Sequence, residues 1–269
     1  MNRLLVVPRT ILTWVVGVIA TILGAVSVML IALVDDTSPF IERVIRGWSR
    51  AWLVASGTRL EVTGQEHVDP GRSYVVVANH ISSLDIMACF LAVRLPIRYL
   101  AKKELFKVPV LAQGMRAVGI IEVDRAARGA IHGEVNRQAK ELIEKKRSLI
   151  IYAEGTRPRD GVMRPFKKGA FTMAITGGLP VLPVSIHGSF QAFPPGQPWV
   201  RGGKVAVIID PPLETKGMGA SDTGPLRDRV YDTIAGRVRS LGGAVGTPPS
   251  GEQGARQVEG ESASGEDAP

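Results

Sequence analysis

The 269-residue sequence has one cysteine, Cys89, and only four histidines. A single cysteine excludes an intrachain disulfide and a cysteine metal cluster. No spacing of Asp, His and Cys is typical of a metal site, and no glycine-rich nucleotide loop follows a predicted strand. We therefore expect neither a metal nor a bound cofactor. Cys89 falls on the apolar side of a predicted helix, where packing explains it better than reactivity, and a reducing cytoplasmic environment suits it.

Aromatic residues are also few, with four tryptophans and four tyrosines, and no stretch interleaves them with basic residues. The net charge of +8 is unevenly distributed, because residues 242–269 hold five acidic residues and one arginine. The rest of the chain therefore carries about +12, which favours an anionic partner: a lipid surface, an acidic carrier protein or nucleic acid. Without basic and aromatic interleaving, nucleic acid is the weakest of the three.

Charge is absent from Ile11 to Val34, a run that spans about 36 Å if helical. That length is enough to cross or deeply enter the hydrocarbon core of a membrane. The run is too long, and its end too poor in small residues, for a cleaved signal peptide. The next segment, Pro39–Ser56, has the pattern of an amphipathic helix whose tryptophans and arginines suit the headgroup region. We expect residues 1–57 to form a membrane-embedded two-helix anchor.

Two arrangements of this anchor are compatible with the sequence. Either the first helix spans the membrane and places the rest of the chain opposite the amino terminus, or the two helices form a hairpin within one leaflet. We favour the hairpin, because an active site on the cytoplasmic face then needs no translocation of a basic amino terminus. The expected location is the cytoplasmic membrane.

From residue 58 onward, apolar segments of strand type and helix type alternate. Strands are predicted at residues 60–63, 74–78, 97–101, 119–123, 148–153, 181–186 and 205–209, and helices at 86–91, 111–118, 131–143, 169–176 and 223–241. This alternation predicts an α/β fold with a mixed, largely parallel sheet flanked by helices. We assign this domain to residues 58–241 and the Gly-, Ser- and Pro-rich residues 242–269 to a disordered tail.

The stretch Asn79–Asp85 follows the buried strand predicted at residues 74–78. In a continuous helix His80 and Asp85 would point about 140° apart, so they meet only if Asp85 begins a helix after a turn, with Ser82 or Ser83 as its N-cap. A carboxylate that accepts the Nδ1 proton leaves Nε2 as a base near neutral pH. On these residues alone, a histidine bound to a backbone carbonyl is an equally good interpretation.

Polar clusters follow four predicted strands: Asn79-His80, Lys102-Lys103, Asp124-Arg125 and Glu154–Arg157. If these strands are parallel, the clusters share one edge of the sheet. A base and its carboxylate would then face cations, and arginine binds phosphate in a bidentate manner while lysine adds a point charge. Because no Ser or Cys is placed to act as a nucleophile, the pattern favours acyl transfer to a phosphorylated, membrane-resident alcohol.

Four blocks resemble the glycerolipid acyltransferases typified by 1-acylglycerol-3-phosphate acyltransferase. They lie in order within Leu60–Pro212: Asn79–Asp85 with its His-x4-Asp pattern, Gly119–Arg125, Glu154–Arg157 and Leu179–Val184. Any one block is weak, but four in order at reasonable spacing are specific. One departure is Pro158, where the family commonly has serine; it could bend the loop but leaves the charged groups intact.

The resemblance implies acylation of the free hydroxyl of a lysophospholipid, with lysophosphatidate giving phosphatidate in phospholipid biosynthesis. The donor implied is a thioester of coenzyme A or of acyl carrier protein. The family's motifs imply that His80 is the general base and that Asp85 orients it. The substrate-binding residues that we carry over are Lys103, Arg125, Glu154, Gly155, Thr156 and Arg157.

Within that set, Arg125 and Arg157 are expected to hold the acceptor phosphate with Lys103, for which Lys102 is a rival. Backbone N–H groups near Gly155 are candidates for stabilising the developing oxyanion. Glu154 either binds the glycerol of the acceptor or braces the cationic loop, and the sequence does not choose between these roles.

Two alternatives stay open. The first keeps the chemistry and changes the acceptor to another lysolipid or a glycolipid. The second is a membrane-tethered scaffold that binds anionic lipid or a carrier protein without turnover. A scaffold would not consume thioester, and the presence of both His80 and Asp85 weighs against it.

Overall fold

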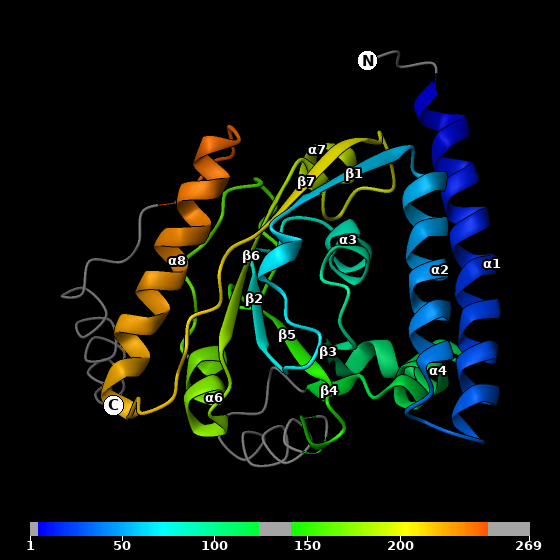
Figure 1. Ribbon diagram of the computed structural model, residues 1–269. Helices are drawn as coiled ribbons and strands as arrows, with labels where there is room; N and C mark the ends of the chain where they lie inside the picture. The colour runs from blue at the N-terminus through cyan, green and yellow to red at the C-terminus, as the bar shows by residue number, and fades with distance from the viewer. Residues whose placement is uncertain (1–4, 124–140, 142, 247–269) are drawn as a thin grey trace, which may run out of the picture.

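The computed structural model describes residues 5–123, 141 and 143–246. Two long helices, α1 (Val6–Ala32) and α2 (Pro39–Ala55), precede a seven-stranded sheet flanked by helices (Figure 1). The strands are β1 (Thr58–Thr63), β2 (Val75–Ala78), β3 (Ile97–Lys102), β4 (Ile121–Val123), β5 (Ser148–Tyr152), β6 (Val181–His187) and β7 (Gly203–Ile209). The further helices are α3 (Leu84–Ala92), α4 (Leu111–Val118), α6 (Gly169–Gly177), α7 (Ser189–Ala192) and α8 (Thr223–Ser240), with 3-10 turns η2 (Gln65–His67), η3 (Lys103–Lys107) and η4 (Ala220–Asp222). The helix predicted over residues 131–143 falls largely outside the described residues.

The sheet has the strand order β1-β7-β6-β2-β5-β3-β4. Strands β6, β2, β5, β3 and β4 run parallel, whereas β7 is antiparallel to β6 and carries β1 parallel to itself. The predicted mixed, largely parallel sheet is therefore confirmed. Because β2, β3, β4 and β5 all end at the same edge, the residues that follow them are gathered there.

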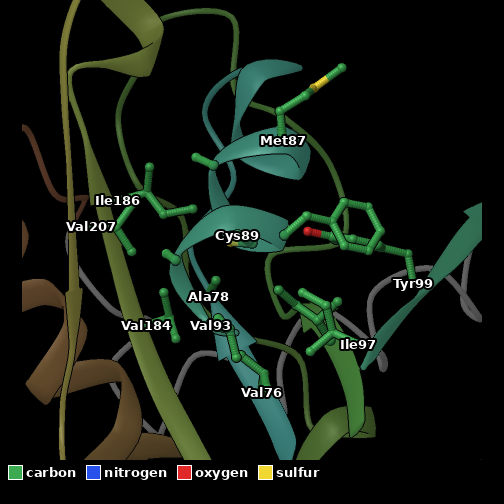
Figure 2. Packing of buried hydrophobic residues seen from close by; sticks show 14 of the residues in the cluster. Val76, Ala78, Met87, Cys89, Val93, Ile97, Tyr99, Val184, Ile186 and Val207 are labelled. Atoms are coloured by element: carbon green, nitrogen blue, oxygen red, sulfur yellow. The ribbon is translucent and has the colours of Figure 1, made fainter. Parts of the chain in front are cut away.

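Strand β2 lies at the centre of the sheet and is buried on both faces. Its side chains alternate: Val75 and Val77 join the cluster under α6 and α8, and Val76 and Ala78 join the cluster under α3. Figure 2 shows the second cluster, in which Cys89 of α3 is fully buried, as its packing role requires. Helices on both faces hold β2 rigidly, so its carboxyl end is a firm base for the loop that follows.

Helices α1 and α2 lie side by side at one end of the molecule (Figure 1). Gly17 of α1 sits against the indole of Trp52, where an added Cβ would lie 2.4 Å from Cζ2, so a larger residue would force the helices apart. Thr13 Oγ1 donates to the carbonyl of Ala55 at 3.0 Å. Helix α1 has a mean hydropathy of 2.6 in its most apolar window, of which 17% is buried. The outer face of α1 is therefore an exposed apolar surface.

Polar contacts join both ends of α1 to the α/β part of the chain. Near its start, Thr10 Oγ1 accepts from the N–H of Val200 at 2.9 Å and the Trp14 indole donates to the carbonyl of Pro198 at 3.2 Å. After its end, Asp36 accepts from the side chains of Lys145 and Arg147. The helix consequently lies along the domain over its whole length.

A buried ion pair fixes α2 as well. Arg98 of β3 is 1% exposed, and its Nη2 lies 2.6 Å from Glu42 Oε1. The same guanidinium donates to the carbonyls of Ile97 and Val118. All three donating nitrogens are therefore used, as a buried guanidinium requires.

The predicted disordered tail begins too early. Residues Gly243–Gly246 are ordered and lie beside Met163, with the N–H of Met163 donating to the carbonyl of Ala244 at 3.0 Å and the N–H of Gly246 donating to that of Met163 at 2.9 Å. Short glycine-rich sequence carries no periodic pattern, so these backbone hydrogen bonds could not be predicted. Residues 247–269 lie outside the described part of the chain.

Candidate functional site

The loop that follows β2 turns sharply away from the sheet, and it is held by the side chain of Asn79. The Asn79 amide donates to the carbonyl of Ile186 at 2.8 Å and accepts from the N–H of the same residue at 2.8 Å. Asn79 is fully buried. The Asn79 side chain thus makes the two backbone hydrogen bonds that a neighbouring strand would make, at the point where the pairing of β2 and β6 ends. We refer to residues 79–83 as the His80 loop.

His80 and Asp85 are in contact. The Nδ1 atom of His80 lies 2.8 Å from Asp85 Oδ2, and Asp85 stands in the first turn of α3, as its predicted meeting with His80 requires. Asp85 is fully buried, whereas the His80 side chain keeps 12% of its surface exposed. A buried carboxylate acceptor holds the proton on Nδ1 and leaves Nε2 without a proton for an incoming hydroxyl.

The same carboxylate also organises the turn. Asp85 Oδ2 accepts from the N–H groups of Ile81 and Ser82 at 2.7 and 2.8 Å, and Oδ1 accepts from Ser189 Oγ at 2.5 Å. Four hydrogen bonds therefore compensate the burial of Asp85. Ser189 lies 104 residues further along the chain, and sequence analysis missed it because no local pattern connects α7 to Asp85.

Of the two serines predicted to cap α3, only Ser82 makes a capping contact. Its Oγ accepts from the N–H of Leu84 at 3.2 Å and donates to the carbonyl of Phe193 at 2.7 Å. Ser83 occupies the N-cap position, but its side chain makes no capping hydrogen bond and instead accepts from Arg157 Nη1. Ser83 is therefore the N-cap residue by position, as predicted, but its hydroxyl does not cap the helix and instead brings a cation beside the His80 loop.

Tyr152, the last residue of β5, stacks on the imidazole of His80. The ring centroids are 3.8 Å apart and the planes differ by 7°. The Tyr152 hydroxyl in turn lies 3.5 Å from that of Tyr99. Stacking restricts rotation of the imidazole. Tyr152 is paired with Ala78 in the β2–β5 register, so only the strand order reveals that it reaches His80.

Glu154 links the His80 loop to the segment after β5. Its Oε1 accepts from the N–H of His80 and its Oε2 from the N–H of Arg164, each at 2.7 Å. The residue is 4% exposed, and burial raises the pKa of its carboxyl to about 7 in spite of these two bonds. Both oxygens point at backbone rather than at an open space, so the geometry favours the bracing role over glycerol binding.

The raised pKa of Glu154 predicts a pH-dependent stability. The folded protein retains the proton at pH values where the unfolded chain has lost it, so the free energy of unfolding falls as pH rises from about 4.5 to 7, by about 3 kcal/mol. Glu154→Gln should abolish this contribution, and Glu66→Gln, at an exposed site, should keep it. Unfolding in detergent at several pH values measures the difference; parallel curves for wild type and Glu154→Gln would contradict the prediction.

Cations lie around the same loop. Gly155 has φ +80, and a Cβ at that position would lie 3.0 Å from Lys167 Nζ, so the glycine lets this lysine approach. Arg157 and Thr156 are exposed in the same segment, and Lys103 begins η3 directly after β3. For Lys102, the alternative to Lys103, the Nζ atom lies 3.4 Å from Glu104 Oε1. The structure thus brings Arg157 to the His80 loop and places Lys103 at the same edge of the sheet.

The prediction that Asp124 and Arg125 join this edge of the sheet is not tested by the described residues. Strand β4 is parallel to β3 and ends at Val123, at the edge where the other clusters lie. Asp124 and Arg125 themselves fall outside the described part of the chain, so the distance between His80 and Arg125 stays a prediction. Within that part, no three side chains of His, Cys, Asp and Glu are grouped in a way that could hold a metal ion.

An apolar cavity of about 270 Å³ begins beside the His80 loop. Its walls come from four helices and from β3, and they are almost entirely aliphatic or aromatic. Ser83 and Ile86 lie at one end, while Ala25, Val28 and Trp48 of the α1–α2 pair form another wall. The α1–α2 pair therefore forms part of the pocket next to the site, in addition to exposing an apolar face.

A protein-family model described as Acyltransferase matches residues 59–187, the part of the chain that contains the His80–Asp85 pair. The chain is similar to the 1-acylglycerol-3-phosphate acyltransferases of the glycerolipid acyltransferase family. The predicted family resemblance is thereby confirmed.

Relatives with assigned names agree. The chain is 31% identical over 178 residues to "1-acyl-sn-glycerol-3-phosphate acyltransferase alpha" of Homo sapiens, covering 66% of this chain and 63% of that protein. It is 28% identical over 191 residues to the 1-acyl-sn-glycerol-3-phosphate acyltransferase of Borreliella burgdorferi, covering 71% and 75%. The chain thus spans a little under two thirds of the length of the mammalian relatives it matches.

A solved structure shares the fold. The 1-acyl-sn-glycerophosphate acyltransferase PlsC from Thermotoga maritima superposes with a TM-score of 0.77 at 26% sequence identity. The alignment covers 90% of this chain and 98% of that one.

Proposed function

We propose that this protein transfers a fatty acyl group from an acyl thioester to the free hydroxyl of 1-acylglycerol-3-phosphate, giving phosphatidate. The observation that carries the proposal is the contact of His80 with the buried Asp85, next to Arg157 and at the end of an apolar cavity. A base, a phosphate-binding cation and a space for an acyl chain are the three parts that this reaction needs.

The chemistry follows from the proton positions. With Nδ1–H donated to Asp85, the Nε2 atom of His80 accepts the proton of the lysolipid hydroxyl as the oxygen attacks the thioester carbonyl. The new C–O bond forms a tetrahedral intermediate. Its collapse breaks the C–S bond, and the departing thiolate takes the proton from His80. The buried carboxylate of Asp85 stabilises the transient imidazolium, and the stacked ring of Tyr152 restricts its rotation.

The cations position the acceptor. Arg157, with Lys103 and Arg125, is proposed to bind the phosphate. This contact places the glycerol hydroxyl near Nε2 of His80, so the acyl transfer starts from a bound and oriented acceptor. The apolar cavity suits the acyl chain of a substrate, because its lining has almost no polar surface. The donor, acyl-CoA or acyl carrier protein, presents its thioester from solution.

Arg157→Ala should raise the KM for lysophosphatidate about 10- to 100-fold with a much smaller change in kcat, because a charge-assisted hydrogen bond to phosphate is lost. Monoacylglycerol, which lacks the phosphate, should show a much smaller loss. Arg159→Ala, an exposed neighbour in the same segment, is the matched control. Steady-state kinetics with both acceptors measure the effect; equal losses for the two acceptors would reject the phosphate role.

The membrane arrangement that we propose is the one-leaflet hairpin. A helix of 27 residues is about 40 Å long, and a helix that crossed a bilayer would have to leave the domain over most of that length. Instead, the first turns of α1 contact the α/β part through Thr10, and the loop after its end does so through Asp36. The exposed apolar face of α1 then lies in the lipid and the site faces the cytoplasm.

Tags at residues 1 and 269 should therefore lie on the same side of the membrane. Both should be digested by protease added to inside-out vesicles and both protected in right-side-out vesicles. A tag on a loop of known orientation in another membrane protein provides the control for vesicle orientation. Protection of one tag alone would establish a spanning helix and reject the hairpin.

The reaction itself is tested with mixed acceptors. Purified protein in detergent–lipid micelles receives one isotopically labelled acyl thioester and equimolar lysophosphatidate, lysophosphatidylethanolamine, lysophosphatidylglycerol and monoacylglycerol. Mass spectrometry should find the label chiefly in phosphatidate. A label in another lipid would reassign the acceptor, and unconsumed thioester with retained lipid binding would support the scaffold alternative.

A further inference from the structure

Helix α8 ends in a geometry that redirects the chain towards the site. Gly242 has φ +83 and donates to the carbonyl of Arg239 at 2.9 Å, while Gly243 donates to that of Val238 at 2.8 Å. These are the two hydrogen bonds of a Schellman motif, in which glycine takes the left-handed position. The turn directs residues Gly243–Gly246, which we name the strap, back across the edge of the domain.

The strap pairs with a single residue of the segment after β5. Met163 donates to Ala244 and accepts from Gly246, and it forms a parallel bridge with Val245. The hydroxyl of Tyr231 donates to the carbonyl of Gly246 at 2.9 Å and so holds the far end of the strap on α8. Met163 itself is fully buried. Its backbone hydrogen bonds to the strap are therefore shielded from water.

The residue after Met163 leads directly to the His80 loop. The N–H of Arg164 donates to one oxygen of Glu154, and the N–H of His80 donates to the other. Glu154 is nearly fully buried, so removal of either donor would leave a carboxylate oxygen unsatisfied. The strap is thus hydrogen-bonded to Met163, the next residue Arg164 is hydrogen-bonded to Glu154, and Glu154 is hydrogen-bonded to the backbone of His80.

A small cavity of about 170 Å³ separates the strap from the His80 loop. Asn79 and Ile81 line one side of it, and Gly243 and Ala244 line the other. A Cβ on Gly243 would lie 2.5 Å from Val238 Cγ1 and 2.9 Å from His187 Nδ1. Only glycine therefore lets the strap close this side of the domain.

We propose that the strap is a positioning element for His80, which acts by fixing Met163 and, through Arg164 and Glu154, the backbone of the His80 loop. The inference deepens the proposed function, because it rests on His80 being the base. Loss of the strap should leave the fold intact and displace the imidazole, and a displacement of about 1 Å can reduce a rate about 100-fold.

Two shortened chains separate the strap from the rest of the tail. A chain that ends at Gly246 should keep kcat within twofold of the full-length protein. A chain that ends at Gly242 should lose at least tenfold in kcat, with the KM for lysophosphatidate changed less than threefold. A chain ending at Gly242 with kcat within twofold of the full length would overturn the proposal.

Hydrogen exchange gives a readout that does not depend on activity. In the chain ending at Gly242, the amides of His80 and Arg164 should exchange at least tenfold faster, while those of β2 and β6 stay unchanged. A uniform increase across the protein would mean a merely structural role and overturn the proposal, as would unchanged exchange at both amides. An inactive full-length protein would reject the proposed function and leave this measurement valid.

If the chain ending at Gly242 does not fold, a full-length variant makes the same test. Gly243→Ala displaces the strap through its contact with Val238, whereas Gly236→Ala adds a methyl to the same helix with nothing within 4 Å. Gly243→Ala should reproduce the loss of kcat and the faster exchange at His80, and Gly236→Ala should show neither. Equal behaviour of the two variants would overturn the proposal.

Discussion

His80→Ala is expected to reduce kcat for acyl transfer about 10³-fold while the protein still folds and associates with vesicles. The imidazole is held by Asp85 on one ring nitrogen and stacked on Tyr152, so its second nitrogen is the group positioned to take a proton. General-base catalysis contributes about 10²–10⁴-fold, and no neighbouring side chain of the His80 loop can replace it. Release of free thiol from the donor, followed in the presence of lysophosphatidate, measures the loss.

His67→Ala is the matched control, because its Nδ1 is bonded to the carbonyl of Ile209 and it lies outside the His80 loop. This variant should keep kcat within a few fold of wild type. Vesicle flotation should find both variants bound to lipid to the same extent. Near-normal turnover by His80→Ala would reject its role as the base, whatever the behaviour of His67→Ala.

Asp85→Asn should reduce kcat by about 10³-fold, a loss comparable with that of His80→Ala. The amide can turn only one oxygen towards the four donors that now surround the carboxylate, from His80, Ile81, Ser82 and Ser189. If the amide oxygen takes the place of Oδ2, the NH₂ group faces the Ser189 hydroxyl, but the neutral amide no longer stabilises the imidazolium. If the NH₂ group takes that place, it faces the N–H groups of Ile81 and Ser82 and forces the imidazole to place its proton on Nε2, where it blocks the base. Both outcomes oppose proton transfer.

The same substitution should lower the free energy of unfolding by about 1–3 kcal/mol, because the buried donors around residue 85 lose a charged acceptor. Asp232→Asn, on the exposed face of α8, should change neither kcat nor stability. Kinetics must therefore be measured well below the melting temperature of Asp85→Asn, with circular dichroism showing that it is folded. A folded Asp85→Asn protein with kcat within tenfold of wild type would show that Asp85 only shapes the turn.

The local parts of the fold could be predicted because their signals are local. Residues 74–78 are a dense apolar run of strand length, and the observed strand is Val75–Ala78. The His-x4-Asp spacing predicted a turn followed by a helix start, and Asp85 stands there. Strand–helix alternation predicted the shared edge that collects the residues after β2, β3 and β5.

The missing parts of the site depend on contacts between distant residues. Ser189 and Tyr152 reach the His80–Asp85 pair only through the strand order, which places β6 and β5 on either side of β2. No property of either residue in the sequence indicates that neighbourhood. The reversed direction of β7 and β1 likewise follows from tertiary packing, and the strap depends on backbone hydrogen bonds, which leave no periodic pattern in the sequence.

The buried pair of Arg98 and Glu42 has a consequence for how the protein meets its acceptor. This pair and the contacts of Asp36 join α1 and α2 to the sheet, so if the two helices lie in one leaflet as proposed, the height of His80 above the lipid plane is fixed. Turnover should then depend on how deep in the headgroup layer a lipid carries its hydroxyl. Two acceptors with equal affinity would be acylated at different rates if their hydroxyls lie at different depths.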